Sequence, residues 1–358
     1  MKRYIIIFTI CLLINNISYA DELTEDYLST EHYISFDIKN DQILYSKNAD
    51  SIIYPASLTK LMTALILLDN YQLSDYITSK YPDNYENKGK VAYIPENIKI
   101  NIENLLELLL VYSANDAAYI SALAVSDSVD DFLNLMNDKA KLLNMDNTNY
   151  SNPDGIDNSN HYTTLNDLLK LTIEISENIE LLSIVSKTKF VYEISGVEKT
   201  YKSTNLIIND GFIGLKTGWT DLAGLTFIGL NQSNNREIIT IVNKSFVDED
   251  KITHFKDTKS LYKASIKSFK SIYIVNKNEN MYAIRNSTNT IYQKTSKDWN
   301  IFTNIDKNNK LVFNKFDENK LFFSYEKYDN SFKTYISEYK IKWSFNPLKI
   351  FQINANQK

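Results

Sequence analysis

The sequence predicts an α+β fold, in which an antiparallel sheet receives an inserted helical lobe and is followed by a small all-β C-terminal domain. Three observations predict it. Segments with the two-residue alternation of strands stand at both ends of the first 245 residues. Segments with helical periodicity lie between them. From about residue 267 the chain turns into short aromatic strands separated by Asn, Lys and Asp turns.

The first strands form a predicted β-hairpin. Tyr33–Ile38 and Gln42–Ser46 alternate around the turn residues Lys39–Asp41. Pro55-Ala56 then introduces Ser57-Leu58-Thr59-Lys60. The run Leu61–Leu68 that follows is apolar nearly all round, as expected for a helix buried inside a domain.

Helices and then strands continue the predicted order. A helical region spans residues 101–125 and is interrupted at Ser113–Asp116. The further predicted segments are the amphipathic helices Asp130–Leu143 and Leu165–Ile179, a glycine-rich strand hairpin at Gly211–Gly229, the strand Arg236–Asn243 and a closing helix Ile252–Ile266. The predicted strands of the C-terminal domain are Ser271–Val275, Met281–Ile284, Lys310–Phe313, Leu321–Tyr325 and Thr334–Phe345.

Glycine is concentrated in the predicted hairpin. The chain has 8 glycines, and five of them fall between Gly211 and Gly229. Because a glycine inside a strand commonly marks a bulge or a close ligand, Lys216-Thr217-Gly218 within this run is a candidate site. A cation and a hydroxyl there would suit an anionic ligand along a strand edge. A glycine-containing turn without function is the alternative interpretation.

Composition narrows the class of protein. Residues 1–20 read as a secretory signal peptide with a basic end, an apolar run and a small-x-small cleavage site. The single cysteine, Cys11, lies inside it, so we expect no disulfide, no cysteine nucleophile and no thiolate metal site after cleavage. The net charge of −5 becomes −7 once Lys2 and Arg3 are removed, which gives no electrostatic case for binding nucleic acid.

Ser57 and Lys60 are candidates for nucleophilic chemistry. They are three residues apart at a predicted helix start, so their side chains share a face. A serine hydroxyl needs a base, and lysine serves when burial or a neighbouring cation lowers its pKa. The Ser-x-x-Lys pattern alone is weak, since it also begins at Ser186, Ser260, Ser324 and Ser337. Only Ser57 follows a proline-led cap and precedes a long buried helix.

A second weak pattern gains weight from its spacing. Ser113-x-Asn115 is either a polar turn or a hydroxyl that relays a proton beside an amide that holds the substrate. The order Ser-x-x-Lys, Ser-x-Asn and Lys-Thr-Gly is typical of penicillin-binding proteins and class A β-lactamases.

The chain resembles the low-molecular-weight D-alanyl-D-alanine carboxypeptidases, serine peptidases of the penicillin-binding-protein-5 type. The resemblance covers roughly residues 30–265, and the stretches that carry it are Tyr54–Ala64, Ser113–Ala118, Asn152–Asp157 and Asp210–Asp221. It implies the penicillin-binding-protein/β-lactamase-like transpeptidase fold. Together with the signal-peptide pattern and the change of texture at about residue 267, it predicts three segments: a signal peptide (1–20), a catalytic domain (21–266) and a β-rich C-terminal domain with a short tail (267–358).

The resemblance implies a function and a role for each candidate. The expected activity is removal of the terminal D-Ala from peptidoglycan pentapeptides through an acyl-enzyme, without a cofactor or metal. The expected partners are stem peptides ending in D-Ala-D-Ala and β-lactam antibiotics. Ser57 is the expected nucleophile, Lys60 its general base and Ser113 a proton relay. The expected substrate contacts are Asn115, Lys216, Thr217 and Gly218, with an oxyanion hole from the backbone N–H groups of Ser57 and Trp219.

The chain departs from the family pattern twice. The loop 80–100 carries Pro95-Glu96-Asn97 where a glycine-containing turn is common, which leaves the shape of the loop open. The basic residue often found before the Lys-Thr-Gly strand has no clear counterpart near Ser203–Asn205, which leaves part of carboxylate recognition open. The three histidines have no ligand spacing, and we expect His161 to order its loop.

Two functions are alternatives to the carboxypeptidase activity. A class A β-lactamase uses a glutamate about 36 residues past the Ser-x-Asn serine, and residues 147–151 contain none. A catalytically silent cell-wall-binding protein is the other alternative. Such proteins usually lose the nucleophile or its lysine, whereas this chain keeps both. We expect a periplasmic enzyme, with at most weak peripheral contact to the inner membrane through the short tail after Asn346.

Overall fold

The computed structural model describes residues 28–194, 196–233 and 236–275, and beyond them the backbone of six further strands. The described chain falls into two compact units, one ending at Ser265 and the other beginning at Ile266. The elements of the first unit, in chain order, are β1 (His32–Asp37), β2 (Gln42–Lys47), a 3-10 turn (Ala56–Thr59), α1 (Lys60–Asn70), β3 (Tyr76–Thr78), β4 (Lys99–Asn101), α2 (Ile102–Leu106), a π-helical segment (Glu107–Tyr112), α3 (Asn115–Val125), α4 (Val129–Leu142), α5 (Leu165–Ser176), α6 (Ile179–Val185), β5 (Lys189–Ile194), β6 (Val197–Lys202), a 3-10 turn (Ile208–Asp210), β7 (Phe212–Thr220), β8 (Gly224–Ser233), β9 (Arg236–Ser245) and α7 (Thr253–Ser268), which runs past the boundary.

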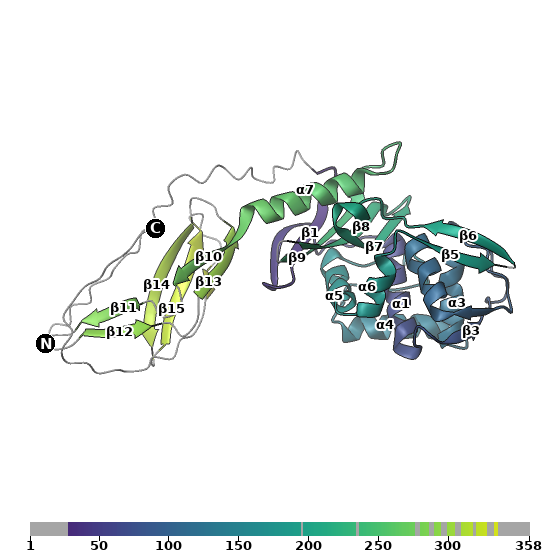
Figure 1. Cartoon of the computed structure of the whole chain (residues 1–358), viewed down its shortest axis with the longest axis horizontal. Coiled ribbons are helices and arrows are strands. Elements are labelled where there is room, and N and C mark those ends of the chain that lie inside the picture. The colour runs from purple at the N-terminus through teal and green to yellow at the C-terminus, as the bar shows by residue number, and fades with distance from the viewer. Residues whose placement is uncertain are drawn as a thin grey trace. The chain divides into compact units, whose positions relative to one another are not determined.

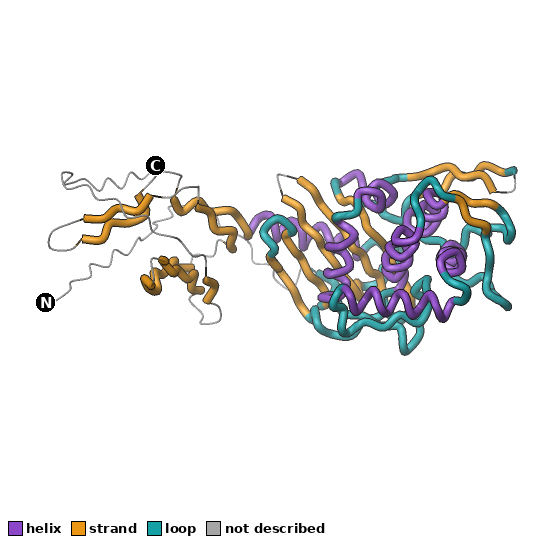
Figure 2. Tube along the Cα trace, turned by 90° about the horizontal axis from the view of Figure 1, so that it is seen from below, coloured by secondary structure: helices purple, strands orange, loops and turns teal. Residues whose placement is uncertain are grey.

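A five-stranded antiparallel sheet organises the first unit, with the strand order β2-β1-β9-β8-β7 (Figures 1 and 2). β1 from the start of the chain pairs with β9 from the end of the unit, with Tyr33 opposite Val242. The helices α1 to α6 all lie in sequence between β2 and β7. The predicted union of the two chain ends by an antiparallel sheet, with a helical lobe inserted, is confirmed.

Buried side chains of alternate strand residues pack on both faces of the sheet. On β8, Phe227 faces α7 and packs against Phe255 with ring centroids 5.1 Å apart. The next residue, Ile228, belongs to the core shared with the helical lobe. Figure 1 shows α7 along one face of the sheet and α5 and α6 on the other. The sheet is therefore a central layer, as the two-residue period of its strands requires.

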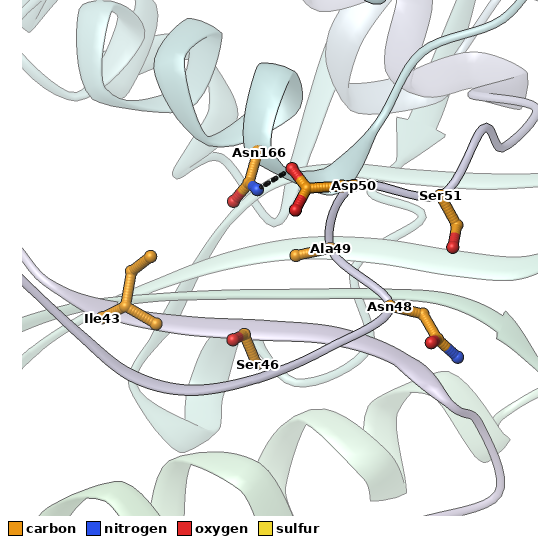
Figure 3. A pocket seen from close by; sticks show the side chains of 7 residues that line it. All are labelled: Ile43, Ser46, Asn48, Ala49, Asp50, Ser51 and Asn166. Atoms are coloured by element: carbon orange, nitrogen blue, oxygen red, sulfur yellow. Dashed lines mark hydrogen bonds between the residues drawn. The ribbon is translucent and has the colours of Figure 1, made fainter. Parts of the chain in front are cut away.

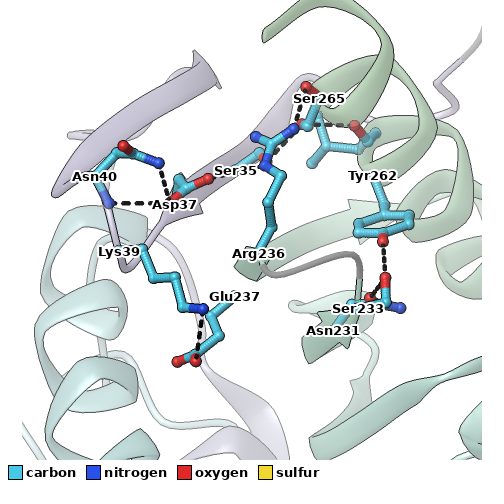
Figure 4. Close-up of polar contacts among 11 residues, drawn as sticks. Ser35, Asp37, Lys39, Asn40, Asn231, Ser233, Arg236, Glu237, Tyr262 and Ser265 are labelled. Atoms are coloured by element: carbon cyan, nitrogen blue, oxygen red, sulfur yellow. Dashed lines mark hydrogen bonds and ion pairs between the residues drawn. The ribbon is translucent and has the colours of Figure 1, made fainter. Parts of the chain in front are cut away.

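Polar contacts join α7 to the strands β1 and β9 (Figure 4). The buried Asp37 accepts a hydrogen bond from Arg236 Nε at 3.0 Å. The hydroxyls of Ser35 on β1 and Ser265 on α7 lie 2.7 Å apart. Because these groups are buried, each contact satisfies a polar atom that would be costly to leave unpaired.

The helices match the prediction except at one boundary. All residues of α1 from Lys60 to Leu67 are buried, as its apolar composition indicated. The predicted helix Leu165–Ile179 is wrong at its end, because Asn178 accepts a hydrogen bond from Leu181 N and caps a separate helix, α6. The hairpin β5–β6 was not predicted.

The second unit contains short strands, and its side chains lie outside the described part from residue 270 onward. The strands are β10 (Phe269–Val275), β11 (Asn280–Arg285), β12 (Thr290–Lys294), β13 (Trp299–Asn304), β14 (Asn309–Asp317), β15 (Lys320–Lys327) and β16 (Lys333–Tyr335). They pair antiparallel as β10–β13, β11–β12 and β14–β15–β16. The signal peptide (1–20), most of the predicted strand Thr334–Phe345 and the tail lie outside the described residues. Within the described part, no helix has the length and apolar character needed to cross a membrane.

Candidate active site

Ser57 lies in a strained turn at the base of α1. The 3-10 turn Ala56–Thr59 runs directly into α1 at Lys60. Ala56 has φ +48°, a left-handed conformation that is costly for a residue with a Cβ. Gly155 packs against this turn so closely that a Cβ added to it would lie 1.8 Å from the Ala56 carbonyl oxygen. Strain of this kind concentrates at functional sites.

Lys60 is fully buried, and its Nζ has three oxygen partners. These are Ser57 Oγ at 2.9 Å, Asn115 Oδ1 at 2.7 Å and the backbone oxygen of Asp154 at 2.7 Å. The last two oxygens carry no hydrogen, so both must accept from the amine. A neutral amine has two hydrogens for them and keeps its lone pair for the Ser57 hydroxyl.

The environment of Lys60 makes that neutral form easier to reach. Its pKa is lowered from 10.5 to about 8, mainly by burial and to a smaller extent by nearby Lys90, while the carboxylates of Asp154 and Asp116 act in the opposite direction. Desolvation is the largest of these effects. The geometry and the pKa together make Lys60 able to take the proton of Ser57.

A second serine–lysine pair lies beside the first. The π-helical segment ends at Ser113, which has φ 72° and ψ 37° in the left-handed region. Lys216 Nζ donates to Ser113 Oγ at 2.8 Å and to the backbone oxygen of Thr217 at 2.9 Å. Burial, followed by the charges of Lys60 and Lys90, places the pKa of Lys216 well below its usual value. The pair can therefore pass a proton through the Ser113 hydroxyl.

The Lys-Thr-Gly strand runs along the nucleophile turn. β7 has a register shift between Gly214 and Lys216, so the bulge that its glycines indicated is present. A Cβ added to Gly218 would lie 3.1 Å from Ser57 N and 2.8 Å from Thr226 Cγ2, which explains the glycine. Thr217 Oγ1 donates to Thr204 Oγ1 at 2.7 Å. A neutral hydroxyl, that of Thr204, thus stands next to Thr217.

The side chain of Trp219 contributes to the surface around the site. It follows Gly218 on β7 and is 45% exposed. The Nζ of Lys251 lies 3.6 Å from its ring centroid, within cation–π range. The predicted contribution of Trp219 is its backbone N–H, and that role stays a prediction.

The loop 79–98 wraps over Asn115. Asn115 Nδ2 donates to Lys88 O at 2.8 Å, and Asn115 N donates to Lys90 O at 2.7 Å. Gly89, between them, has φ +67°, and an added Cβ would lie 2.6 Å from Asn115 Nδ2. Asn97 has φ 62° and so takes the left-handed position that a glycine would otherwise fill. The shape that the sequence left open is set by these contacts.

His161 ties its loop to the nucleophile turn. Ser151 N donates to Nδ1 at 2.9 Å, so Nε2 carries the ring proton and donates to Thr59 Oγ1 at 2.7 Å. Burial, followed by the charge of Lys60, lowers the His161 pKa to about 4. Its expected structural role is thus extended by a contact with Thr59, which the sequence did not reveal.

All eight predicted site residues are therefore brought to one place or line its edge, whereas the Asp154 carbonyl, Thr204 and Lys90 were missed. The signals for Asp154 were its place in the family-like stretch Asn152–Asp157 and its neighbour Gly155 in a glycine-poor chain. No cluster of His, Cys, Asp or Glu able to hold a metal exists among the described residues. An open hollow of about 620 Å³ lies elsewhere, between β2 and the start of α5 (Figure 3). The residues that line it contain no lysine or histidine. They are Ile43, Ser46, Asn48, Ala49, Asp50, Ser51 and Asn166.

Comparison with known proteins agrees with this geometry. The family model of D-alanyl-D-alanine carboxypeptidases, peptidase S11, matches residues 20–246. The D-alanyl-D-alanine carboxypeptidase DacF of Bacillus subtilis is 30% identical over 216 residues, which are 56% of this chain and 54% of that protein. A D-alanyl-D-alanine endopeptidase of Haemophilus influenzae is 31% identical over 243 residues, 65% of this chain and 82% of that protein.

A solved structure extends the likeness to three dimensions. Penicillin-binding protein D2 of Listeria monocytogenes, in its cefotaxime-bound form, is 30% identical to this chain. The match covers 67% of this chain and 98% of that protein, with a TM-score of 0.59. Since the family model covers more than half of the sequence, the chain belongs to the peptidase S11 family of D-alanyl-D-alanine carboxypeptidases, which are serine DD-peptidases and homologues of the penicillin-binding proteins.

Proposed function

We propose that this protein is a serine-type D-alanyl-D-alanine carboxypeptidase that removes the terminal D-Ala from peptidoglycan pentapeptides. The observation that carries the proposal is the contact between Lys60 and Ser57. Lys60 Nζ is 2.9 Å from Ser57 Oγ, and its other two hydrogen bonds go to oxygens that can only accept. This arrangement places an amine of lowered pKa within reach of the serine proton.

The proposed reaction has two steps. Ser57 Oγ attacks the carbonyl carbon of the penultimate D-Ala, its proton passes to Lys60, and the backbone N–H groups of Ser57 and Trp219 stabilise the oxyanion. Ser113, supported by Lys216, donates a proton to the leaving amine as the peptide bond breaks. Water then hydrolyses the ester and restores Ser57.

Substrate contacts follow from the same geometry. Lys216 and Thr217, beside Gly218, bind the terminal carboxylate of the departing D-Ala, and Asn115 contacts an amide of the acyl part. β-Lactams fit the same site because their amide and carboxylate resemble this peptide terminus. The cefotaxime-bound relative supports the proposal that this chain binds them as well.

The test is release of D-Ala from a synthetic pentapeptide ending in D-Ala-D-Ala, together with intact-mass analysis after penicillin treatment. Wild type is expected to release D-Ala and to gain one drug adduct, and Ser57→Ala is expected to do neither. Ser186→Ala is the matched control, because it removes the serine of another Ser-x-x-Lys pattern at an exposed position. An adduct that persists in Ser57→Ala would overturn the assignment.

Cleavage of cross-linked peptides is the second candidate, favoured by the endopeptidase relative that matches over 82% of its length. Digestion of a purified cross-linked muropeptide dimer separates it from carboxypeptidase activity. Rapid release of hydrolysed penicillin would instead indicate the β-lactamase alternative. A protein with no adduct and no product would be a silent cell-wall-binding homologue.

We further propose a periplasmic location and a separate C-terminal domain. The apolar run and cleavage pattern of residues 1–20 support export. The short antiparallel strand pairs beyond residue 268 support a small all-β domain at 267–358. Weak peripheral contact of the tail with the inner membrane completes the proposal.

A further inference from the structure

Two lysines from separate elements meet at one tyrosine beside Ser113. Lys90 Nζ, from the loop 79–98, lies 4.1 Å from the ring centroid of Tyr112. Lys199 Nζ, from β6, lies 6.0 Å from the same centroid and 4.9 Å from the ring of Tyr201. Tyr112 directly precedes Ser113 in the chain. We call the two lysines, Lys90 and Lys199, together with the Tyr112 ring that both contact, the outer cation pair.

The outer cation pair has no counter-ion within the part of the chain that the structure describes. No carboxylate there lies within 4.0 Å of either Nζ. Two ammonium groups close to one aromatic ring repel each other, and a bound anion would relieve that repulsion. Because the whole protein carries a net charge of −5, this local excess of positive charge is not a consequence of composition.

The charge of Lys90 also reaches the reacting groups. It contributes to lowering the pKa of both Lys60 and Lys216. The two carboxylates that face this region, those of Asp116 and Asp154, are buried. The oxygens of Asp116 accept backbone hydrogen bonds from Ala92, Ile94 and Ala117. The outer cation pair therefore provides a positive charge that attracts anions.

The position of the pair indicates which part of a substrate it meets. The backbone oxygen of Lys90 accepts from Asn115 N at 2.7 Å, so the loop that carries Lys90 lies on the Asn115 side of the site. Under the proposed function, Lys216 and Thr217 take the carboxylate of the departing D-Ala, and Asn115 contacts the acyl part. A carboxylate at Lys90 and Lys199 would therefore belong to the acyl part.

We propose that the outer cation pair is a subsite for a side-chain carboxylate on the acyl part of the peptide. The enzyme then prefers stem peptides whose third residue carries a free carboxylate over those in which it is amidated. The inference rests on the proposed carboxypeptidase function.

The test compares two synthetic pentapeptides, L-Ala-γ-D-Glu-X-D-Ala-D-Ala, in which X is meso-diaminopimelate or its side-chain amide. Wild type is expected to release D-Ala from the free acid with a kcat/KM about threefold to tenfold higher, the range expected for one or two partly exposed ion pairs. The difference is expected in KM, and to shrink as salt is added. In the double variant Lys90→Gln/Lys199→Gln the preference is expected to fall below about twofold.

Two further variants make the result specific. Lys90→Arg/Lys199→Arg keeps both charges and is expected to retain the preference. Lys202→Gln removes a lysine three residues along β6, on the opposite strand face, and is expected to retain it as well. Equal kcat/KM for the two peptides in wild type, or an undiminished preference in the Gln double variant, would overturn the inference. Failure to release D-Ala from either peptide would overturn the proposed function instead.

Discussion

At the scale of single residues, the two buried lysines differ in their hydrogen-bond partners. Lys60 contacts three oxygens, and Lys216 donates to Ser113 Oγ and to a backbone oxygen. Burial and the charge of Lys60 lower the pKa of Lys216, so full protonation of both lysines is disfavoured.

The rate of acylation by penicillin is expected to follow the neutral form of Lys60. Because burial places its pKa at about 8, the rate should rise about tenfold per pH unit below that value and level off above it. Lys60→Arg should lose nearly all acylation at every pH, because arginine stays protonated. Stopped-flow measurement from pH 6 to 10 checks both. A pH-independent rate, or an arginine variant within about tenfold of wild type, would place the base elsewhere.

Gly155 is expected to be irreplaceable for a steric reason. An alanine Cβ there would lie 1.8 Å from the Ala56 carbonyl oxygen, so Gly155→Ala must displace the nucleophile turn. We expect a loss of about 3 kcal/mol or more in the free energy of unfolding, together with loss of penicillin binding. Urea denaturation and mass analysis measure the two effects.

Gly196 supplies the matched control. It also has a positive φ, +78°, but a Cβ there meets nothing within 4 Å. Gly196→Ala should therefore cost only the backbone strain, about 1–2 kcal/mol, and should leave penicillin binding intact. If the two variants behave alike, backbone strain rather than the contact with Ala56 explains Gly155.

At the scale of elements, Asp116 fastens the loop 79–98 to α3. Its buried carboxylate accepts from Ala92 N at 3.0 Å and from Ile94 N at 3.0 Å. The neighbouring Asn115 holds the same loop through Lys88 and Lys90. One end of α3 therefore fixes both Asn115, the proposed substrate contact, and the loop beside it.

Asp116→Asn is expected to loosen that wall. An amide replaces one acceptor oxygen by a donor, so at least one buried backbone N–H loses its partner, at a cost of roughly 1.5–3 kcal/mol. Hydrogen exchange at Ala92 and Ile94 should become faster. Asp138→Asn is the control, because its ion pair with Lys141 on α4 is exposed and should contribute little. Unchanged exchange at both amides in Asp116→Asn would show that other contacts hold the loop.

At the scale of the whole molecule, membrane association is expected to be weak. The tail after Asn346 lies outside the described residues, and its apolar residues are Leu348, Ile350, Phe351 and Ile353. Burying four such side chains yields a few kcal/mol at about 1.5–3 kcal/mol each, before the ordering cost of a short helix. Cell fractionation of the full-length protein and a form ending at Asn346 should find both largely soluble after a high-salt wash. Retention of the full-length form alone in the membrane pellet would identify the tail as an anchor.

Local spacing explains what the sequence determined by itself. Ser57 and Lys60 are three residues apart, so one helical turn brings their side chains together whatever surrounds them. The hairpin β1–β2, the buried helix α1 and the bulge on β7 were predictable for the same reason, because their signals are periodicities or glycines within a few residues. The polar hairpin β5–β6 has one buried residue on β5 and one on β6, so it offered no such signal.

Only the tertiary structure decided which distant groups complete the site. Lys60 and Asp154 are 94 positions apart, and Thr59 and His161 are 102 apart. The pairing of Thr204 with Thr217, and of Lys90 and Lys199 with Tyr112, likewise joins separate elements. No local pattern encodes such contacts, because they depend on how the packed sheet and helical lobe set their loops against one another. The sequence therefore determined the reacting groups, and packing decided their hydrogen-bond partners and the charge around them.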